Sequence, residues 1–175
     1  VAASAVAIAA GISPAMIQKG LESFQPVNGR MQKHSLNNDI TVIDDSYNAN
    51  PDSVRAAIDV LSNIKTSAWL VLGDMGEVGN QGPEFHREVG HYAGEKGIQK
   101  LFALGDLSKE AVLAYQASAT QGNMAQHFAD VAELCTELNK SLHARKNHEE
   151  VTLLVKGSRF MRMERVVKAL AEEMH

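Results

Sequence analysis

The segment from Asp44 to Pro51 carries the densest set of side chains suited to ligand binding. Its sequence, Asp-Asp-Ser-Tyr-Asn-Ala-Asn-Pro, contains a pair of carboxylates and a pair of side-chain amides. It follows a run typical of a β-strand, residues 38–43, and leads directly into a run typical of a helix, residues 51–61. In an open α/β sheet, ligands bind in the crevice outside the carboxyl ends of the strands. We therefore interpret this segment as part of a binding site.

The end of this segment also has a purely structural explanation. Asn50 is suited to be the N-cap of the following helix and Pro51 to be its first residue, which is a common pairing. A loop that only had to turn the chain would not need the remaining polar side chains. Four residues have no such explanation and are predicted to be functional: Asp44, Asp45, Tyr47 and Asn48.

Three further strand-like runs, residues 69–72, 100–104 and 151–155, also end in glycine or charged residues. The residues that follow these runs are Gly73 and Asp74, Gly105 and Asp106, and Lys156 to Arg159. The carboxyl ends of parallel strands meet at one edge of a sheet, so these residues should lie beside the segment 44–51. The sequence therefore predicts a polar pocket along one edge, able to hold an anion.

Two of these strand ends carry motifs of their own. Glycines at every third position of residues 73–79 favour a tight loop, whose contact with a ligand stays open. This loop is not the dinucleotide fingerprint, because no helix is expected before Pro83. Backbone N–H groups after Lys156 favour an anion, and Arg159 could pair with a carboxylate or phosphate. The alternative is that Ser158 only caps a helix and Arg159 is solvated.

Strands alternate with helices from Met31 onward, which predicts a mostly parallel sheet with helices on both faces. Helical spacing is found over residues 51–61, 83–96, 109–116 and 131–142, the last capped by Asp130. A final helix is expected to turn five side chains inward: Phe160, Met163, Val166, Val167 and Leu170. The fold class is therefore a Rossmann-like α/β domain.

Residues 1–24 are predicted to form two short helices divided at residues 11–14, with Ser13 capping the second and Pro14 opening it. The second helix has apolar residues at helical spacing up to Phe24. The first is rich in alanine and lacks the preceding basic residues of a signal peptide, so we expect a buried helix from a longer protein. Residues 25–30 are expected to be a linker or hinge.

The composition excludes several function classes. The 175 residues are 45% hydrophobic, which is enough for a sizeable core. A net charge of −4 gives no reason to expect nucleic acid as a partner. The single cysteine, Cys135, lies on an apolar stripe, so we expect a buried thiol and a reducing, cytoplasmic location. Neither a metal-binding histidine pair nor a Walker A sequence occurs.

Three motifs resemble, in order, the C-terminal domain of the Mur ligases: residues 44–51, 73–77 and 154–159. The resemblance extends over the whole chain. It implies that residues 1–30 are the helical tail of a central ATPase domain with its hinge. It implies that residues 31–175 are the C-terminal Rossmann-like domain. The first and last motifs are those of the member that joins D-alanyl-D-alanine to UDP-N-acetylmuramoyl-tripeptide.

The resemblance also implies an activity, namely an ATP-dependent amide-forming ligase of peptidoglycan synthesis and hence of cell shape and division. In that family ATP, with Mg²⁺, phosphorylates the substrate carboxylate, and the amine of the dipeptide attacks the acyl phosphate. The phosphate-binding loop, the magnesium ligands and a modified lysine of the family precede the region that this chain resembles. We therefore expect the chain to hold no metal ligand and no catalytic residue, and to be inactive without the other domains.

The resemblance assigns binding roles to seven residues. For the nucleotide, Arg30 is expected to reach the phosphates and Asp45 the ribose hydroxyls, with Tyr47 and Asn48 on the adenine side. The residues expected on the dipeptide face are Asn50, Ser158 and Arg159. In this assignment the guanidinium of Arg159 pairs with the terminal carboxylate of D-alanyl-D-alanine.

A different class, the phosphoacceptor receiver domain of signalling proteins, is the alternative. Its acidic pair, acceptor aspartate and lysine would correspond to Asp44, Asp45, Asp74 and Lys156. The spacing disfavours this alternative, because residues 45 to 74 are too few and residues 74 to 156 too many for the intervening units. Receivers also usually place proline after the lysine, where this chain has Gly157.

Overall fold

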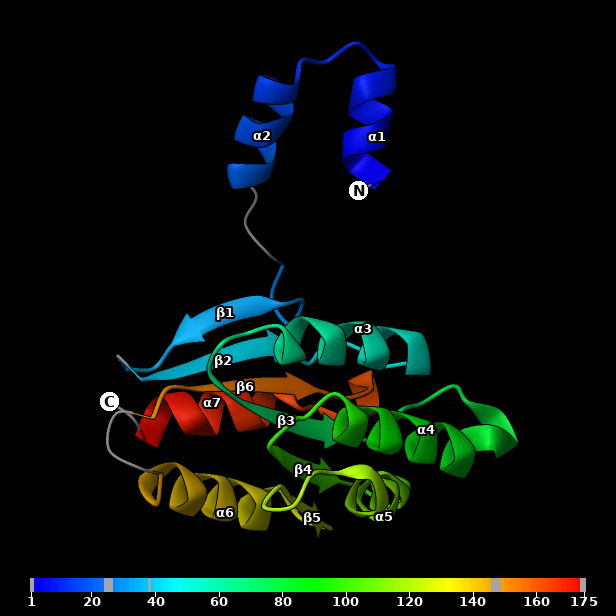
Figure 1. The fold of residues 1–175 in the computed structure, drawn as a ribbon, viewed down its shortest axis with the longest axis vertical. Coiled ribbons are helices and arrows are strands. Elements are labelled where there is room, and N and C mark those ends of the chain that lie inside the picture. The colour runs from blue at the N-terminus through cyan, green and yellow to red at the C-terminus, as the bar shows by residue number, and fades with distance from the viewer. Residues whose placement is uncertain (1, 24–26, 38, 146–148, 174–175) are drawn as a thin grey trace.

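The structure is a computed structural model that describes residues 2–23, 27–37, 39–145 and 149–173. Within these residues one sheet has the strand order β1-β2-β6-β3-β4-β5 (Figure 1). Its strands are β1 (Gln32–Ser35), β2 (Ile40–Asp45), β3 (Ser67–Gly73), β4 (Lys100–Leu104), β5 (Met124–Phe128) and β6 (Val151–Lys156). All neighbouring strands are parallel except β1 and β2.

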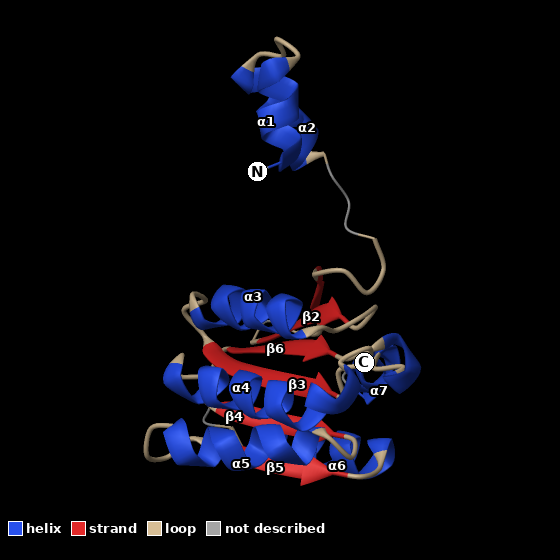
Figure 2. Cartoon of the chain, turned by 90° about the vertical axis from the view of Figure 1, so that its right-hand side faces the viewer, coloured by secondary structure: helices blue, strands red, loops and turns tan. Residues whose placement is uncertain are grey.

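Helices cover both faces of this sheet, as Figure 2 shows, and the Rossmann-like fold is confirmed. One face is covered by α3 (Pro51–Ser62), α4 (Gly82–Glu95) and α5 (Ser108–Ser118). The other is covered by α6 (Val131–His143) and α7 (Glu164–Glu173). Two short 3₁₀ helices, η1 (Gly79–Gln81) and η2 (Arg159–Met161), lie in the loops after β3 and β6.

The central strand β6 joins the two halves of the hydrophobic core. All of its residues are buried. Leu154 packs into the core beneath α3, α4 and α5, whereas Leu153 and Val155 pack into the core beneath α6 and α7. Alternate side chains of a strand point to opposite faces, so an apolar run is what a strand covered on both faces requires.

The edges of the sheet differ from the sequence-based expectation. β1 and β5 were not predicted, because both are short edge strands with polar or half-exposed residues and neither is a continuous apolar run. β2 runs through Asp44 and Asp45, so the acidic pair ends the strand and does not follow it. The expectation for Phe160 was wrong, since the residue precedes α7 and is 64% exposed.

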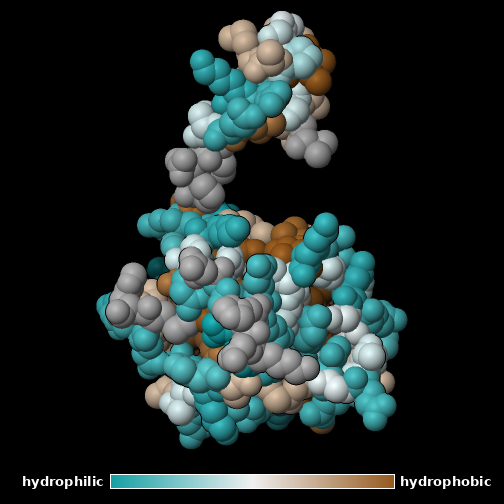
Figure 3. Space-filling view, turned by 60° about the vertical axis from the view of Figure 1, so that its left-hand side comes forward, coloured by the Kyte–Doolittle hydropathy of each residue, from teal (hydrophilic) through white to brown (hydrophobic). Residues whose placement is uncertain are grey.

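The two helices before the sheet form a separate pair, α1 (Ala2–Ala9) and α2 (Pro14–Glu22). Ser13 caps α2 as predicted, accepting a hydrogen bond from the Met16 N–H. Neither helix contains a buried residue, so the expected burial of the alanine-rich helix is not found. Figure 3 shows exposed apolar residues on this helix pair, whereas the face of the sheet domain in the same view is largely hydrophilic. Phe24 and residues 25–26 lie outside the described residues.

No helix within the described part of the chain combines the length and the apolar character that a membrane crossing needs.

Close packing of α4 against α5 depends on Gly90. A Cβ atom built on Gly90 would lie 2.1 Å from the main-chain oxygen of Ala111, far inside van der Waals contact. We predict that Gly90→Ala lowers the free energy of unfolding by about 1–3 kcal/mol, because the helices must move apart. Urea unfolding measures this change.

Gly20→Ala is the matched control for that substitution. Gly20 lies in α2, and nothing lies within 4 Å of its built Cβ atom. Its replacement should leave the transition of the sheet domain in place, since alanine only favours the local helix. Equal destabilisation by both substitutions would contradict the packing argument.

Candidate functional site

The carboxyl ends of β2, β6 and β3 are aligned by the parallel register of the sheet. Asp45 at the end of β2 lies opposite Lys156 at the end of β6, and Lys156 lies opposite Leu72 of β3. This alignment brings the loops that follow the three strands to one rim, as predicted. The rim is the part of an open α/β sheet at which ligands bind.

An ion pair between Lys156 and Asp45 lies at the centre of this rim. The ammonium nitrogen of Lys156 is 2.6 Å from Oδ2 of Asp45 and donates a second hydrogen bond, 2.9 Å long, to the main-chain oxygen of Asn48. The Lys156 side chain is only 3% exposed. Lys156 therefore ties the end of β2 to the loop that follows it.

Asp45 also holds the segment that precedes the sheet. Its Oδ1 accepts a hydrogen bond from the Met31 N–H at 3.2 Å. The N–H of Tyr47 donates to the main-chain oxygen of Gly29 at 2.9 Å. Gly29 has a φ of 72° and Met31 a φ of 52°, so the chain turns sharply on both sides of Arg30. Arg30 is thereby placed beside the segment 44–51.

Tyr47 brings two predicted arginines together. The guanidinium carbon of Arg30 lies 4.2 Å from the centroid of the Tyr47 ring, and that of Arg159 lies 5.9 Å from it. Such contacts are attractive because the face of an aromatic ring is negative. Arg159 also forms an ion pair of 3.1 Å with Glu164 at the start of α7. The nucleotide and dipeptide arginines of the sequence analysis are thus neighbours.

The side chains of Ser158 and Asn50 are largely engaged within the protein. The buried hydroxyl of Ser158 donates to the main-chain oxygen of Ala49 and accepts from the N–H of Gly76. It makes no capping hydrogen bond to η2, so the capping alternative for Ser158 is not found. Oδ1 of Asn50 accepts from the Ser53 N–H at 2.8 Å, which is the predicted N-cap of α3.

The loop after β3 is tight, as predicted, and His86 holds it. The Met75 N–H donates to Nε2 of His86 at 3.0 Å, and Nδ1 of His86 donates to the main-chain oxygen of Gly82. Nε2 is therefore an acceptor, and its 3.9 Å approach to Asp74 is not a charged pair. Glu77 has a φ of 59°, which is uncommon for a residue other than glycine.

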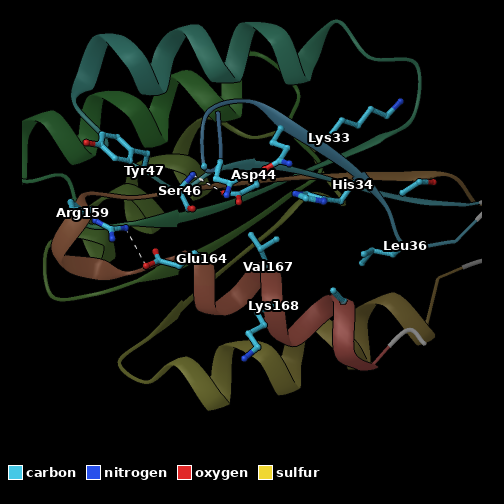
Figure 4. Close-up of a pocket in the computed structure, with 15 residues that line it drawn as sticks. Lys33, His34, Leu36, Asp44, Ser46, Tyr47, Arg159, Glu164, Val167 and Lys168 are labelled. Atoms are coloured by element: carbon cyan, nitrogen blue, oxygen red, sulfur yellow. Dashed lines mark hydrogen bonds and ion pairs between the residues drawn. The ribbon is translucent and has the colours of Figure 1, made fainter. Parts of the chain in front are cut away.

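Three cavities open at the rim: Arg159 lines the first two, and Asn50 lines the third, which has about 550 Å³. The first is a groove of about 980 Å³ between β1 and α7, where Figure 4 shows Tyr47 and Arg159 at one end and His34 and Leu36 toward the other. The second has about 520 Å³. Its lining residues are Asn48, Gly76, Glu77, Ser158, Arg159, Phe160 and Arg162.

Asp44, which was predicted to be functional, is buried in the wall of the groove. Its Oδ1 accepts a hydrogen bond from the Ser46 N–H at 3.0 Å, drawn as a dashed line in Figure 4. This contact resembles the turns that aspartate forms with the backbone two residues further on. A structural role is therefore sufficient to explain Asp44.

Several residues of the rim were missed by the sequence analysis. Phe160 was expected in the core, and Glu77, Arg162 and Glu164 were not assigned. Glu77 and Arg162 line the second cavity, and each has a positive φ, which no sequence pattern predicts. The signal that could have revealed Lys156 is a lysine that directly ends an apolar strand, opposite an acidic strand end.

The receiver-domain alternative is not supported by this geometry. Asp74, its proposed acceptor, is buried and takes hydrogen bonds from the N–H groups of Leu107 and Ser108. Among the described residues no group of three histidine, cysteine or acidic side chains could hold a metal ion. Cys135 is buried as expected, and burial raises the pKa of its thiol, which disfavours the reactive thiolate.

The fold is a Rossmann-like α/β domain with polar residues along one rim of its sheet, and comparison with known proteins identifies its family. Residues 29–159 match the family described as "Mur ligase, glutamate ligase domain". This match covers most of the chain. The chain therefore belongs to the Mur ligase family, and the resemblance inferred from the three motifs is confirmed.

Individual relatives agree with this assignment. The chain is 37% identical over 171 residues to UDP-N-acetylmuramoyl-tripeptide--D-alanyl-D-alanine ligase of Escherichia coli (strain K12), covering 98% of this chain and 36% of the relative. The corresponding ligase of Bacillus subtilis (strain 168) is 31% identical, with 93% and 35% covered. A crystal structure of MurF from Acinetobacter baumannii superposes with a TM-score of 0.83 at 33% identity, with 98% and 36% covered. The chain thus spans about a third of the length of these relatives.

The contact between His86 and the loop after β3 can be tested by removing the ring. We predict that His86→Leu lowers the free energy of unfolding by about 1–3 kcal/mol, because the Met75 N–H loses its buried acceptor. Urea unfolding followed by circular dichroism measures the change.

His91→Leu on the same helix is the control for this substitution. The His91 side chain is 56% exposed and contacts Glu95 one turn further along α4. Its loss should change the stability by less than about 0.5 kcal/mol. If His86→Leu were as mild as His91→Leu, the loop would not depend on the buried imidazole.

Proposed function

We propose that this chain is the C-terminal part of an ATP-dependent ligase that adds D-alanyl-D-alanine to UDP-N-acetylmuramoyl-tripeptide in peptidoglycan synthesis. The activity named for the relatives from Escherichia coli and Bacillus subtilis supports this proposal. In it, residues 1–30 are the helical tail of a central ATPase domain and the hinge, and residues 31–175 are the C-terminal domain. The other partners are the remaining domains of the same protein.

The observation that carries the proposal is the grouping of Arg30, Tyr47 and Arg159 at the ligand-binding rim. Both substrates that would meet there, a nucleotide and a dipeptide, carry anionic groups. Two guanidiniums on one partly exposed aromatic ring provide charge for both of them. A site of this kind suits a domain that closes over a reaction between two anionic substrates.

On the nucleotide side, we propose that Arg30 contacts the phosphates and that Tyr47 and Asn48 lie beside the adenine. Asp45 is proposed to accept hydrogen bonds from the ribose hydroxyls. Its carboxylate already accepts hydrogen bonds from Met31 and Lys156. A carboxylate has about four lone-pair sites, so acceptor capacity remains for a ribose.

On the dipeptide side, we propose that the exposed guanidinium of Arg159 pairs with the terminal carboxylate. That carboxylate would replace Glu164, whose ion pair with Arg159 lies at the surface. Ser158 and Asn50 belong to the same face. The Ser158 hydroxyl joins the loop after β2 to the loop after β3, and Oδ1 of Asn50 caps α3, so their contribution is to shape this face.

In the reaction we propose, ATP supplies the phosphoryl group that activates the tripeptide carboxylate. Mg²⁺ and the residues that transfer this group are proposed to lie in other parts of the complete protein. The role of this chain is to bring the dipeptide amine to the activated carboxylate and to exclude water from it. Positioning and exclusion of water are what the closing domains of enzymes contribute.

The first test is release of ADP by the complete protein with Mg-ATP and UDP-N-acetylmuramoyl-tripeptide, with and without D-alanyl-D-alanine. We expect release that depends on the dipeptide, and none from residues 1–175 alone. Release that ignores the dipeptide would overturn the substrate assignment. The assignment to the Mur ligase family rests on the sequence match and does not depend on this result.

The role of Arg159 leads to a sharper prediction for the complete protein. We predict that Arg159→Ala raises the KM for D-alanyl-D-alanine roughly 10- to 100-fold and leaves the KM for ATP within about twofold. The reason is the loss of a charge-assisted contact with the carboxylate, worth about 1.5–3 kcal/mol. Steady-state ADP release at varied dipeptide concentration measures both constants.

Arg87→Ala is the matched control, because Arg87 is a half-exposed arginine of α4 that pairs with Glu84 and Glu110 away from the rim. It should change neither KM. An unchanged dipeptide KM in Arg159→Ala would remove Arg159 from the dipeptide face.

A further inference from the structure

We infer that Lys156 is a positioning residue of the nucleotide site, which holds Asp45 and the loop of Asn48 in the geometry that binds ATP. This inference rests on the nucleotide roles proposed above for Arg30 and Asp45. Lys156 itself need not touch the nucleotide. It is assigned this role by its burial, its contacts and its place in the fold.

The burial of Lys156 is unusual for a lysine. Its side chain is 3% exposed, and that of Asp45 is 14% exposed. Lysine is almost never fully buried unless it is paired, because removing an ammonium from water is costly. Lys156 meets this requirement with a carboxylate oxygen at 2.6 Å and a main-chain oxygen at 2.9 Å.

The contacts of Lys156 lead to each part of the proposed nucleotide site. The ammonium of Lys156 donates a hydrogen bond to Oδ2 of Asp45 and so fixes this carboxylate. The other carboxylate oxygen, Oδ1, accepts a hydrogen bond from the N–H of Met31. Met31 directly follows Arg30 and has a φ of 52°. A conformation of this kind persists only where surrounding contacts determine it. Asp45 is one such contact, so Lys156 acts on the turn that carries Arg30.

The second hydrogen bond of Lys156 acts on the loop itself. This bond runs from the ammonium of Lys156 to the main-chain oxygen of Asn48, one residue after Tyr47. The hydroxyl of Ser158, two residues after Lys156, likewise donates to the main-chain oxygen of Ala49. The loop 46–49 is therefore held from the end of β6, and the side chains of Tyr47 and Asn48 are oriented by that attachment.

A simpler alternative is that the ion pair only stabilises the fold. The two readings differ when both charges are removed together. Breaking a buried pair leaves one charge uncompensated and destabilises the protein, whereas removing both partners can be nearly neutral. If the role is purely structural, the double variant regains stability and should bind ADP better than Asp45→Asn. If Lys156 positions the loop, the double variant should bind ADP no better than Asp45→Asn, because the ammonium that orients the loop is missing as well.

The experiment uses the complete protein with Lys156→Met, Asp45→Asn, the double variant and the control Lys140→Met. Lys140 lies on α6 with a side chain that is 74% exposed and pairs with Glu137. The measurements are kcat, the KM values for ATP and for the tripeptide, the dissociation constant of ADP by calorimetry, and the melting temperature.

We expect Lys156→Met to raise the KM for ATP and the ADP dissociation constant at least about 10-fold, the scale found when a group that orients a metal-binding side chain is lost. The KM for the tripeptide should stay within twofold. The double variant should regain the melting temperature but bind ADP no better than Asp45→Asn. Its effect on ATP should be smaller than the product of the two single effects, since both act through one contact. Lys140→Met should change none of these quantities.

An ADP affinity of the double variant above that of Asp45→Asn would overturn the inference, as would normal affinity in Lys156→Met. If Lys156→Met does not fold, the comparison of the double variant with Asp45→Asn still tests the inference, because both variants lack the Asp45 carboxylate and differ only at Lys156. If the unchanged protein releases no ADP in response to the dipeptide, the proposed function fails, and the ADP dissociation constants still decide the role of Lys156.

Discussion

β6 lies between β2 and β3 at the centre of the sheet, and it hydrogen-bonds in parallel register to both. Its residues are buried on both faces, so neither half of the core is complete without it. The same register sets Lys156 opposite Asp45 and puts the loops after β2, β3 and β6 at one rim. Packing of the core and assembly of the rim are therefore consequences of a single strand insertion.

Much of this arrangement could be predicted from the sequence, because it follows from local patterns. The apolar runs of β3, β4 and β6 and the caps at Ser13, Asn50 and Asp130 were all recognisable. The convergence of polar strand ends followed from the parallel sheet alone. The family followed from three ordered motifs that ordinary turns would not need.

What the sequence did not reveal depends on contacts between distant residues. β1 and β5 lie at the edges of the sheet, where half of the pairing and most of the burial are absent, so their patterns are weak. Phe160 has the spacing of a core residue, yet the left-handed φ of Arg162 separates η2 from α7, and Phe160 lies on the surface. Ser158 was assigned to the dipeptide face, with a helix cap as the alternative, and its hydroxyl joins two loops. The spacing of apolar residues along the sequence reveals neither the edge strands, nor the exposure of Phe160, nor the contacts of Ser158.

The insertion of β6 also has a consequence for how the protein is made. A ribosome completes β2, β3, β4 and β5 before it reaches Val151, so the growing chain has two groups of strands with nothing between them. The facing edges of β2 and β3 then present unpaired backbone groups, which attract other strands. Contacts between residues more than a hundred positions apart also close slowly. A nascent chain that stops before residue 151 would carry the rim residues of the loops after β2 and β3 but no rim, and its open strands would make it a substrate for chaperones.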